Sequence, residues 1–93
     1  MMDVRFRARA RADLRAIHSW IAKDSPETAA RVVDRILRSV ERLAQFPQMG
    51  RKGKVEGTRE WPIPRLPYIV VYEIEEALNR LTVLAIFHSA QDR

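Results

Sequence analysis

Apolar side chains alternate with arginines at the start of the chain. Val4, Phe6 and Ala8 fall on one side of an extended segment, and the arginines between them fall on the other, as in a half-buried strand. From residue 10 the apolar spacing changes to three and four residues, the period of an amphipathic helix. The apolar face of this helix comprises Ala10, Leu14, Ile17 and Ile21. The pattern predicts a short strand and then a helix that ends near Lys23 and Asp24.

A second helix is predicted to begin after Ser25. The Ser25 side chain can accept a hydrogen bond from a free backbone N–H, Pro26 suits the first helical position, and Glu27 favours the positive end of the helix dipole. Pro47 ends the helix near Phe46, so the two helices should pack as an antiparallel hairpin. The apolar face comprises Ala29, Val32, Val33, Ile36, Leu37, Val40, Leu43 and Ala44. The opposite side carries a stripe of arginines that we interpret as a solvated face: Arg31, Arg35, Arg38 and Arg42.

The second half of the chain has the pattern of strands. Residues 47–58 contain all three glycines and several charges, which predicts a mobile basic loop. Strand character returns over 59–63, although Pro62 and Pro64 confine that segment to an edge or an irregular passage. Residues 68–74 form the strongest strand, and a polar connection over 75–79 separates it from a last strand over 81–87. These three segments predict an antiparallel meander.

Both faces of the predicted meander are apolar. In the central strand, Ile69 and Val71 point away from the face formed by Tyr68, Val70, Tyr72 and Ile74. Continued alternation through the last strand places Leu84 and Ile86 away from Leu81, Val83, Ala85 and Phe87. An antiparallel sheet normally keeps one face wet, and the helical hairpin can cover only one. Part of the other face is therefore available to a partner, or strong sheet curvature and the long loop cover it internally.

Composition limits the class of protein further. A chain of 93 residues without an apolar leader or membrane span predicts one unexported, cytoplasmic domain over residues 1–93. The chain has no cysteine and only two histidines, so we expect no cofactor and no metal site. Seventeen lysines and arginines against twelve acids give a net charge of +5, which attracts polyanions or acidic protein segments.

Several local motifs together resemble one family. They are the helix face from Asp13-Leu14 to Ile21, the turn from Phe46-Pro47 to Gly50-Arg51, the strand entry Gly57-Thr58-Arg59-Glu60, the segment Pro67-Tyr68-Ile69-Val70-Val71-Tyr72, and the terminal His88. In this order and spacing they resemble the RelE/ParE family of bacterial toxins over essentially the whole chain. The resemblance implies an α+β fold in which an N-terminal strand and an antiparallel two-helix hairpin pack on a small, mainly antiparallel sheet.

The resemblance also implies a function and partners. The chain is expected to be the toxin of a type II toxin–antitoxin pair, bound by a ParD-like or similar antitoxin whose disordered, often acidic tail folds across its surface, in an assembly that can form higher-order oligomers. The spare sheet face and the positive charge suit such a tail. We expect the antitoxin to contact Ile69, Val71, Leu84 and Ile86.

Two mechanisms follow from the family. RelE-like members are ribosome-dependent endoribonucleases that cut messenger RNA, whereas ParE-like members poison DNA gyrase. For a nuclease the candidate residues are His88 as acid or base, Arg59 and Arg65 as phosphate stabilisers, and Tyr68 or Tyr72 as an auxiliary donor. For a gyrase poison, Arg59, Arg65 and His88 are the candidate target contacts.

The number and position of the basic residues favour the gyrase mechanism. RelE-like nucleases carry a denser set of lysines and arginines over the sheet and a tyrosine in the C-terminal tail, whereas this chain ends Ser89-Ala90-Gln91-Asp92-Arg93. We therefore favour a ParE-like toxin without catalytic residues of its own, and keep the ribosome-dependent nuclease as the alternative. A basic nucleic-acid-binding module is a third reading, supported only by the pI and the arginine stripe.

Overall fold

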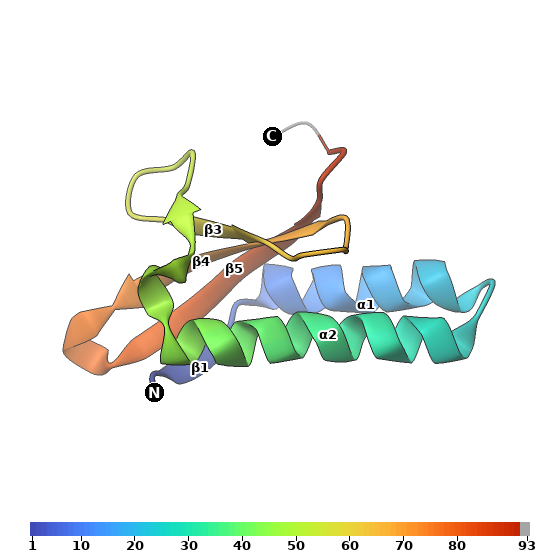
Figure 1. The fold of residues 1–93 in the computed structure, drawn as a ribbon, viewed down its shortest axis with the longest axis horizontal. Helices are drawn as coiled ribbons and strands as arrows, with labels where there is room; N and C mark the ends of the chain where they lie inside the picture. Colours follow the sequence, from blue (N-terminus) through green and yellow to red (C-terminus); the bar gives the residue numbers. More distant parts are fainter. Residues whose placement is uncertain (92–93) are drawn as a thin grey trace.

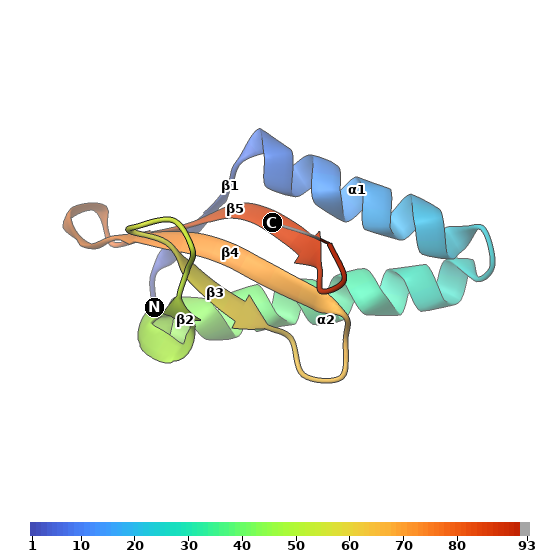
Figure 2. The same cartoon turned by 90° about the horizontal axis from the view of Figure 1, so that it is seen from above.

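The fold is a five-stranded sheet with two helices packed on one of its faces. A computed structural model describes residues 1–91, with the order β1 (Asp3–Phe6), α1 (Ala8–Ala22), α2 (Pro26–Gln45), β2 (Arg51–Lys52), β3 (Arg59–Pro62), β4 (Tyr68–Glu75) and β5 (Arg80–His88). The sheet order is β1-β5-β4-β3-β2. Strands β3, β4 and β5 form the predicted antiparallel meander, and β1 adds to β5 in parallel. The predicted α+β fold is confirmed, with a mixed sheet (Figures 1 and 2).

The helical hairpin begins and ends close to the predicted residues. The Ser25 hydroxyl accepts a hydrogen bond from Thr28 N at 3.2 Å, and Pro26 is the first residue of α2. One boundary is wrong: Ala8, expected to continue the strand, is the first residue of α1. The pairing of β1 with β5 ends at Phe6, so the chain is free to turn into the helix two residues earlier than the apolar spacing indicates.

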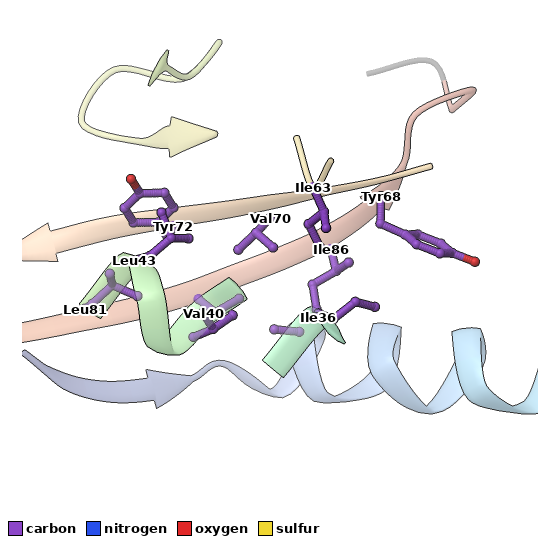
Figure 3. Packing of buried hydrophobic residues seen from close by; sticks show 11 residues of the cluster. Ile36, Val40, Leu43, Ile63, Tyr68, Val70, Tyr72, Leu81 and Ile86 are labelled. Carbon is purple, nitrogen blue, oxygen red and sulfur yellow. The ribbon is translucent and has the colours of Figure 1, made fainter. Parts of the chain in front are cut away.

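The core lies between the helices and the inner face of the sheet, which is the face that the helices cover. Its largest fully buried side chains are Tyr72, Ile36, Leu43, Leu81, Val40, Val70 and Val83. Figure 3 shows Ile36, Val40 and Leu43 of α2 packed toward strand residues that include Val70 and Leu81. Among the described residues, no helix is long and apolar enough to cross a membrane.

A β-bulge changes which side chains of β5 point inward. Tyr72 pairs with Val83, whereas the preceding Val71 pairs with Ala85, so Leu84 is an extra residue in β5. An extra residue reverses the alternation beyond it. Ile86 therefore belongs to the buried core, and its predicted place on the outer face was wrong. Ala85 and Phe87, which were expected to point inward, lie on the outer face.

The basic segment after α2 contains more structure than a mobile loop. It begins with a 3-10 turn over Pro47–Met49 and continues into the short strand β2, which pairs with β3. The Tyr72 hydroxyl holds this turn, because it donates to Pro47 O at 2.7 Å and accepts from Gly50 N at 3.0 Å. Only the residues between β2 and β3 extend as a loop, and this loop rises on the side of the sheet opposite the helices (Figure 1).

Candidate functional site: the outer face of the sheet

The outer face, which the helices leave uncovered, has a charged half and an apolar half. In the charged half, Arg7 forms an ion pair with Glu73 at 3.1 Å, and the Thr82 hydroxyl donates to Glu75 at 3.1 Å. These charges compensate one another and are partly exposed, so the interactions contribute little to the free energy of folding. The apolar half lies beyond the bulge and consists of Ile69, Val71, Leu84, Ala85 and Phe87. The unusual part of this face is therefore its apolar half.

Apart from Ile69, the apolar half forms the floor of a groove of about 320 Å³. One wall is the loop between β2 and β3, and the groove is lined by Lys54, Val55, Thr58, Glu60, Val71, Leu84, Ala85 and Phe87. Val55 is 68% exposed at the loop. The Arg9 guanidinium lies 5.0 Å from the centre of the Phe87 ring, which places a cation at the opposite margin. This cation is already paired with Asp13 at 3.0 Å, so the main feature of the groove is its apolar floor, which suits the apolar side of a protein segment.

A buried carboxylate holds the loop that forms the groove wall. Glu60 is 4% exposed. Its Oε2 accepts a hydrogen bond from Lys54 N at 3.3 Å, and its Oε1 lies 3.6 Å from the Arg51 guanidinium. Buried carboxylates need such partners because desolvation of an unpaired charge is costly. Glu60 therefore joins the loop to β3 and fixes the position of the groove wall.

The predicted nuclease pair lies on the opposite face. Tyr68 and His88 are register partners at the end of β4 and β5, with ring centres 5.5 Å apart and planes at 87°. The His88 Nδ1 accepts a hydrogen bond from Ala90 N at 3.0 Å, so a neutral ring carries its proton at Nε2. Burial raises the pKa of the Tyr68 hydroxyl above its usual value, which disfavours the tyrosinate as a base.

Arg59 is separated from Tyr68 and His88, and its side chain is hydrogen-bonded within the chain. Its guanidinium donates to Gly50 O at 2.6 Å and to the Gln48 side chain. Arg59 pairs with Tyr72, four residues along β4 from Tyr68, so roughly 13 Å of strand separate it from Tyr68. Arg59 therefore braces the turn after α2 and does not join the Tyr68 and His88 pair.

Arg65 lies in the turn between β3 and β4, where it is exposed. The segments that carry Arg65 and His88 are neighbours, because Ser89 N donates to Pro67 O at 2.8 Å. Of the predicted nuclease residues, Tyr68 and His88 are thus in contact, Arg65 lies on an adjacent turn, and Arg59 is apart. Within residues 1–91 no group of three or more acidic or histidine side chains is placed to hold a metal ion.

The arginine stripe of α2 is exposed, as expected of a solvated face. Arg35 donates to Pro64 O at 2.7 Å, Arg38 pairs with Asp34 at 2.8 Å, and Arg42 lies 5.7 Å from the Phe46 ring centre. These arginines bind neighbouring parts of the same chain. The stripe therefore gives no separate support to a nucleic-acid-binding ridge.

Sequence reasoning missed several residues of the groove. Ala85 and Phe87 were placed inward because alternation was continued through an unseen bulge. Glu60 was not singled out, although a glutamate at the start of a strand next to a basic loop is a weak signal for a buried ion pair. The pattern gave no sign that Lys54 and Val55 would border the groove, because loop residues have no fixed periodicity.

The fold is a small α+β domain with an apolar groove on the sheet face opposite the helices. The family model described as "ParE toxin of type II toxin-antitoxin system, parDE" matches residues 4–93. The chain therefore belongs to the ParE toxin family of type II toxin–antitoxin systems, within the wider group that includes RelE toxins.

Relatives and solved structures agree with this assignment. The chain is 42% identical over 81 residues to toxin Y4kP of Sinorhizobium fredii, covering 87% of this chain and 84% of that protein. It is 30% identical over 93 residues to toxin RelE3 of Caulobacter vibrioides, with both chains covered completely. The chromosomal ParDE system of P. aeruginosa contains a chain with a TM-score of 0.83 and 27% identity, covering 95% of this chain and 96% of that one. The E. coli RelBE complex, at 13% identity and a TM-score of 0.72 with both chains fully covered, shares the fold.

Proposed function

We propose that the chain inhibits growth by binding DNA gyrase and that it does not cut RNA. The observation that carries this proposal is the chemistry of the outer face: an apolar floor and a buried carboxylate, Glu60, line its groove. A face that holds RNA needs cations spaced along the phosphates. The gyrase target itself rests on what the resemblance to ParE toxins implies.

The positions of the candidate nuclease groups also support a non-enzymatic toxin. Cleavage of RNA requires a base near the 2'-hydroxyl, an acid near the leaving oxygen, and donors that stabilise the charged phosphate between them. His88 and Tyr68 lie on the inner side of the sheet end, and the Arg59 guanidinium is bound to backbone and side-chain oxygens. Arg65 lies on the turn next to His88, but Arg59 does not join these residues, so a phosphate at this end of the sheet would meet only one of the two candidate arginines.

We further propose that the groove receives the antitoxin. The solved neighbours include toxin–antitoxin complexes, and the apolar side of an amphipathic tail would match the apolar floor. Of the residues expected at this interface, Val71 and Leu84 line the groove and Ile69 lies beside it on the same face. Ala85 and Phe87 replace Ile86, which is turned into the core.

A ribosome-dependent nuclease is the second candidate, because two relatives from Caulobacter vibrioides bear RelE names. The two functions differ in the first process that fails after induction. A gyrase poison should cause filamentation and a DNA-damage response while protein synthesis continues at first. Arrest of protein synthesis within minutes, together with cut messages and loss of both effects in His88→Ala, would refute the proposal. A matched Ser89→Ala variant controls for changes at the strand end.

A further inference from the structure

The turn between β3 and β4 holds an arginine in a strained backbone conformation. Arg65 has a φ of 67°, in the left-handed region that L-residues other than glycine, asparagine and aspartate seldom adopt. The other non-glycine residue with positive φ among residues 1–91 is Asn79, a residue type that tolerates this conformation in tight turns. An arginine at such a position gives up backbone stability, and strained residues of this kind concentrate at functional sites.

Contacts on both sides of the turn hold this conformation in place. The Arg35 guanidinium of α2 donates to Pro64 O at 2.7 Å, and Ser89 N donates to Pro67 O at 2.8 Å. The two prolines also fix their own φ angles. The Arg65 backbone is therefore clamped between α2 and the end of β5, and the side chain is presented from a rigid base. Preorganisation of this kind lowers the entropy that a contact residue loses on binding.

No other residue within 1–91 compensates the positive charge of Arg65. It is the only charged residue in the segment 61–72. Its side chain is exposed and, within residues 1–91, makes no hydrogen bond or ion pair. Arg38, by contrast, is exposed on α2 but is paired with Asp34 at 2.8 Å. Arg65 is thus available to an external anion, whereas Arg38 already has a partner.

We propose that Arg65 is a contact through which the chain binds its cellular target, and that it pairs with a carboxylate on an acidic protein surface. This inference rests on the proposed function, in which the target is a protein. The next residue favours a protein over a nucleic acid: Leu66 is apolar and partly buried, and an arginine beside an apolar group is typical of a binding hot spot. A phosphate backbone would require several cations in a row.

Three substitutions separate the side chain from the strained backbone. Arg65→Ala removes the guanidinium and keeps the left-handed strain. Arg65→Gly removes the guanidinium and relieves the strain, while Arg65→Lys keeps the charge but loses the bidentate geometry. Arg38→Ala is the control for net charge, because it removes one exposed arginine from the helical face.

The test is inhibition of supercoiling by purified DNA gyrase, with thermal melting and growth arrest measured for the same proteins. We expect Arg65→Ala and Arg65→Gly to raise the inhibitory concentration at least about tenfold, Arg65→Lys to have a smaller effect, and Arg38→Ala to have almost none. Arg65→Ala should have the melting temperature of the wild type, and Arg65→Gly should have the same or a higher melting temperature. Because the groove lies elsewhere, both variants should still be neutralised by the cognate antitoxin.

Several results would overturn the proposal. They are full inhibition by both Arg65→Ala and Arg65→Gly, an equal loss in Arg38→Ala, or a loss that follows a fall in melting temperature. If the wild-type chain arrests growth but does not inhibit gyrase, the proposed function fails and Arg65 is judged by growth arrest alone. Arrest that is lost in Arg65→Gly and kept in Arg38→Ala would then still support the Arg65 contact.

Discussion

The Tyr72 hydroxyl is the buried polar group whose removal tests the architecture most sharply. It donates to Pro47 O at 2.7 Å and accepts from Gly50 N at 3.0 Å, while the ring itself is fully buried. Tyr72→Phe keeps the ring and deletes only the oxygen. Tyr68→Phe is the matched control, because the Tyr68 hydroxyl makes no hydrogen bond and is not a buried unsatisfied atom within residues 1–91.

The expected cost follows from the groups that lose their partner. The buried Gly50 N–H would have no acceptor, which costs about 1–3 kcal/mol, and the hydrogen bond to Pro47 O adds about 1 kcal/mol. We therefore expect Tyr72→Phe to lower the free energy of unfolding by about 2–4 kcal/mol. For a domain of this size the melting temperature should fall by about 10–30 °C. Tyr68→Phe should change the free energy by less than about 0.5 kcal/mol.

Urea unfolding followed by circular dichroism measures both variants, and amide hydrogen exchange at Gly50 localises the effect. In Tyr72→Phe this amide should exchange faster under native conditions, because the turn after α2 has lost its central acceptor. The reasoning would be refuted if the two tyrosine variants had equal stability, or if Tyr72→Phe unfolded within about 0.5 kcal/mol of the wild type.

Three other perturbations test separate parts of the account. Asp13 accepts a hydrogen bond from Ile86 N at 2.9 Å and one from Arg9 at 3.0 Å, so Asp13→Ala should cost about 1–2 kcal/mol in urea unfolding; no measurable loss would contradict this role. Leu84→Glu places a charge on the groove floor and should weaken antitoxin binding, measured by calorimetry, at least about tenfold. The control variant Leu78→Glu, in the exposed β4–β5 turn, should bind the antitoxin like the wild type. Raised salt should weaken the wild-type complex only modestly. Burial raises the folded-state pKa of the Tyr72 hydroxyl. The contribution of the neutral hydroxyl to the free energy of unfolding is therefore complete below the unfolded-state pKa of about 10 and is lost as pH rises through the folded-state pKa. A free energy of unfolding that increases with pH in this range would contradict the direction of this pKa shift.

Local patterns in the sequence predicted most of the fold. The cap at Ser25 and the apolar spacing of α2 placed that helix closely, because backbone capping and amphipathic burial are determined by nearby residues. The strong central strand and its two antiparallel neighbours were also predicted, since their β-branched and aromatic residues lie in continuous runs. The parallel pairing of β1 with β5 was not predicted, because it joins residues about 77 positions apart and has no local signature.

The candidate site was predicted only in part, and the bulge is the reason. Val71 and Leu84 were placed on the open face correctly, since alternation holds on each side of the irregularity. One extra residue at Leu84 reversed the assignment of Ala85, Ile86 and Phe87. The burial of Glu60 depends on how the loop folds back over the sheet, and a periodic pattern does not contain that information.

We propose above that the chain stops growth by binding gyrase through surfaces that do not cut RNA. The most direct test places the purified chain in two assays side by side: supercoiling of relaxed plasmid by DNA gyrase, and cleavage of a message bound to translating ribosomes. We expect inhibition of supercoiling that is relieved by the cognate antitoxin, and intact messages at the same toxin concentration. Undisturbed supercoiling together with cut messages would contradict it.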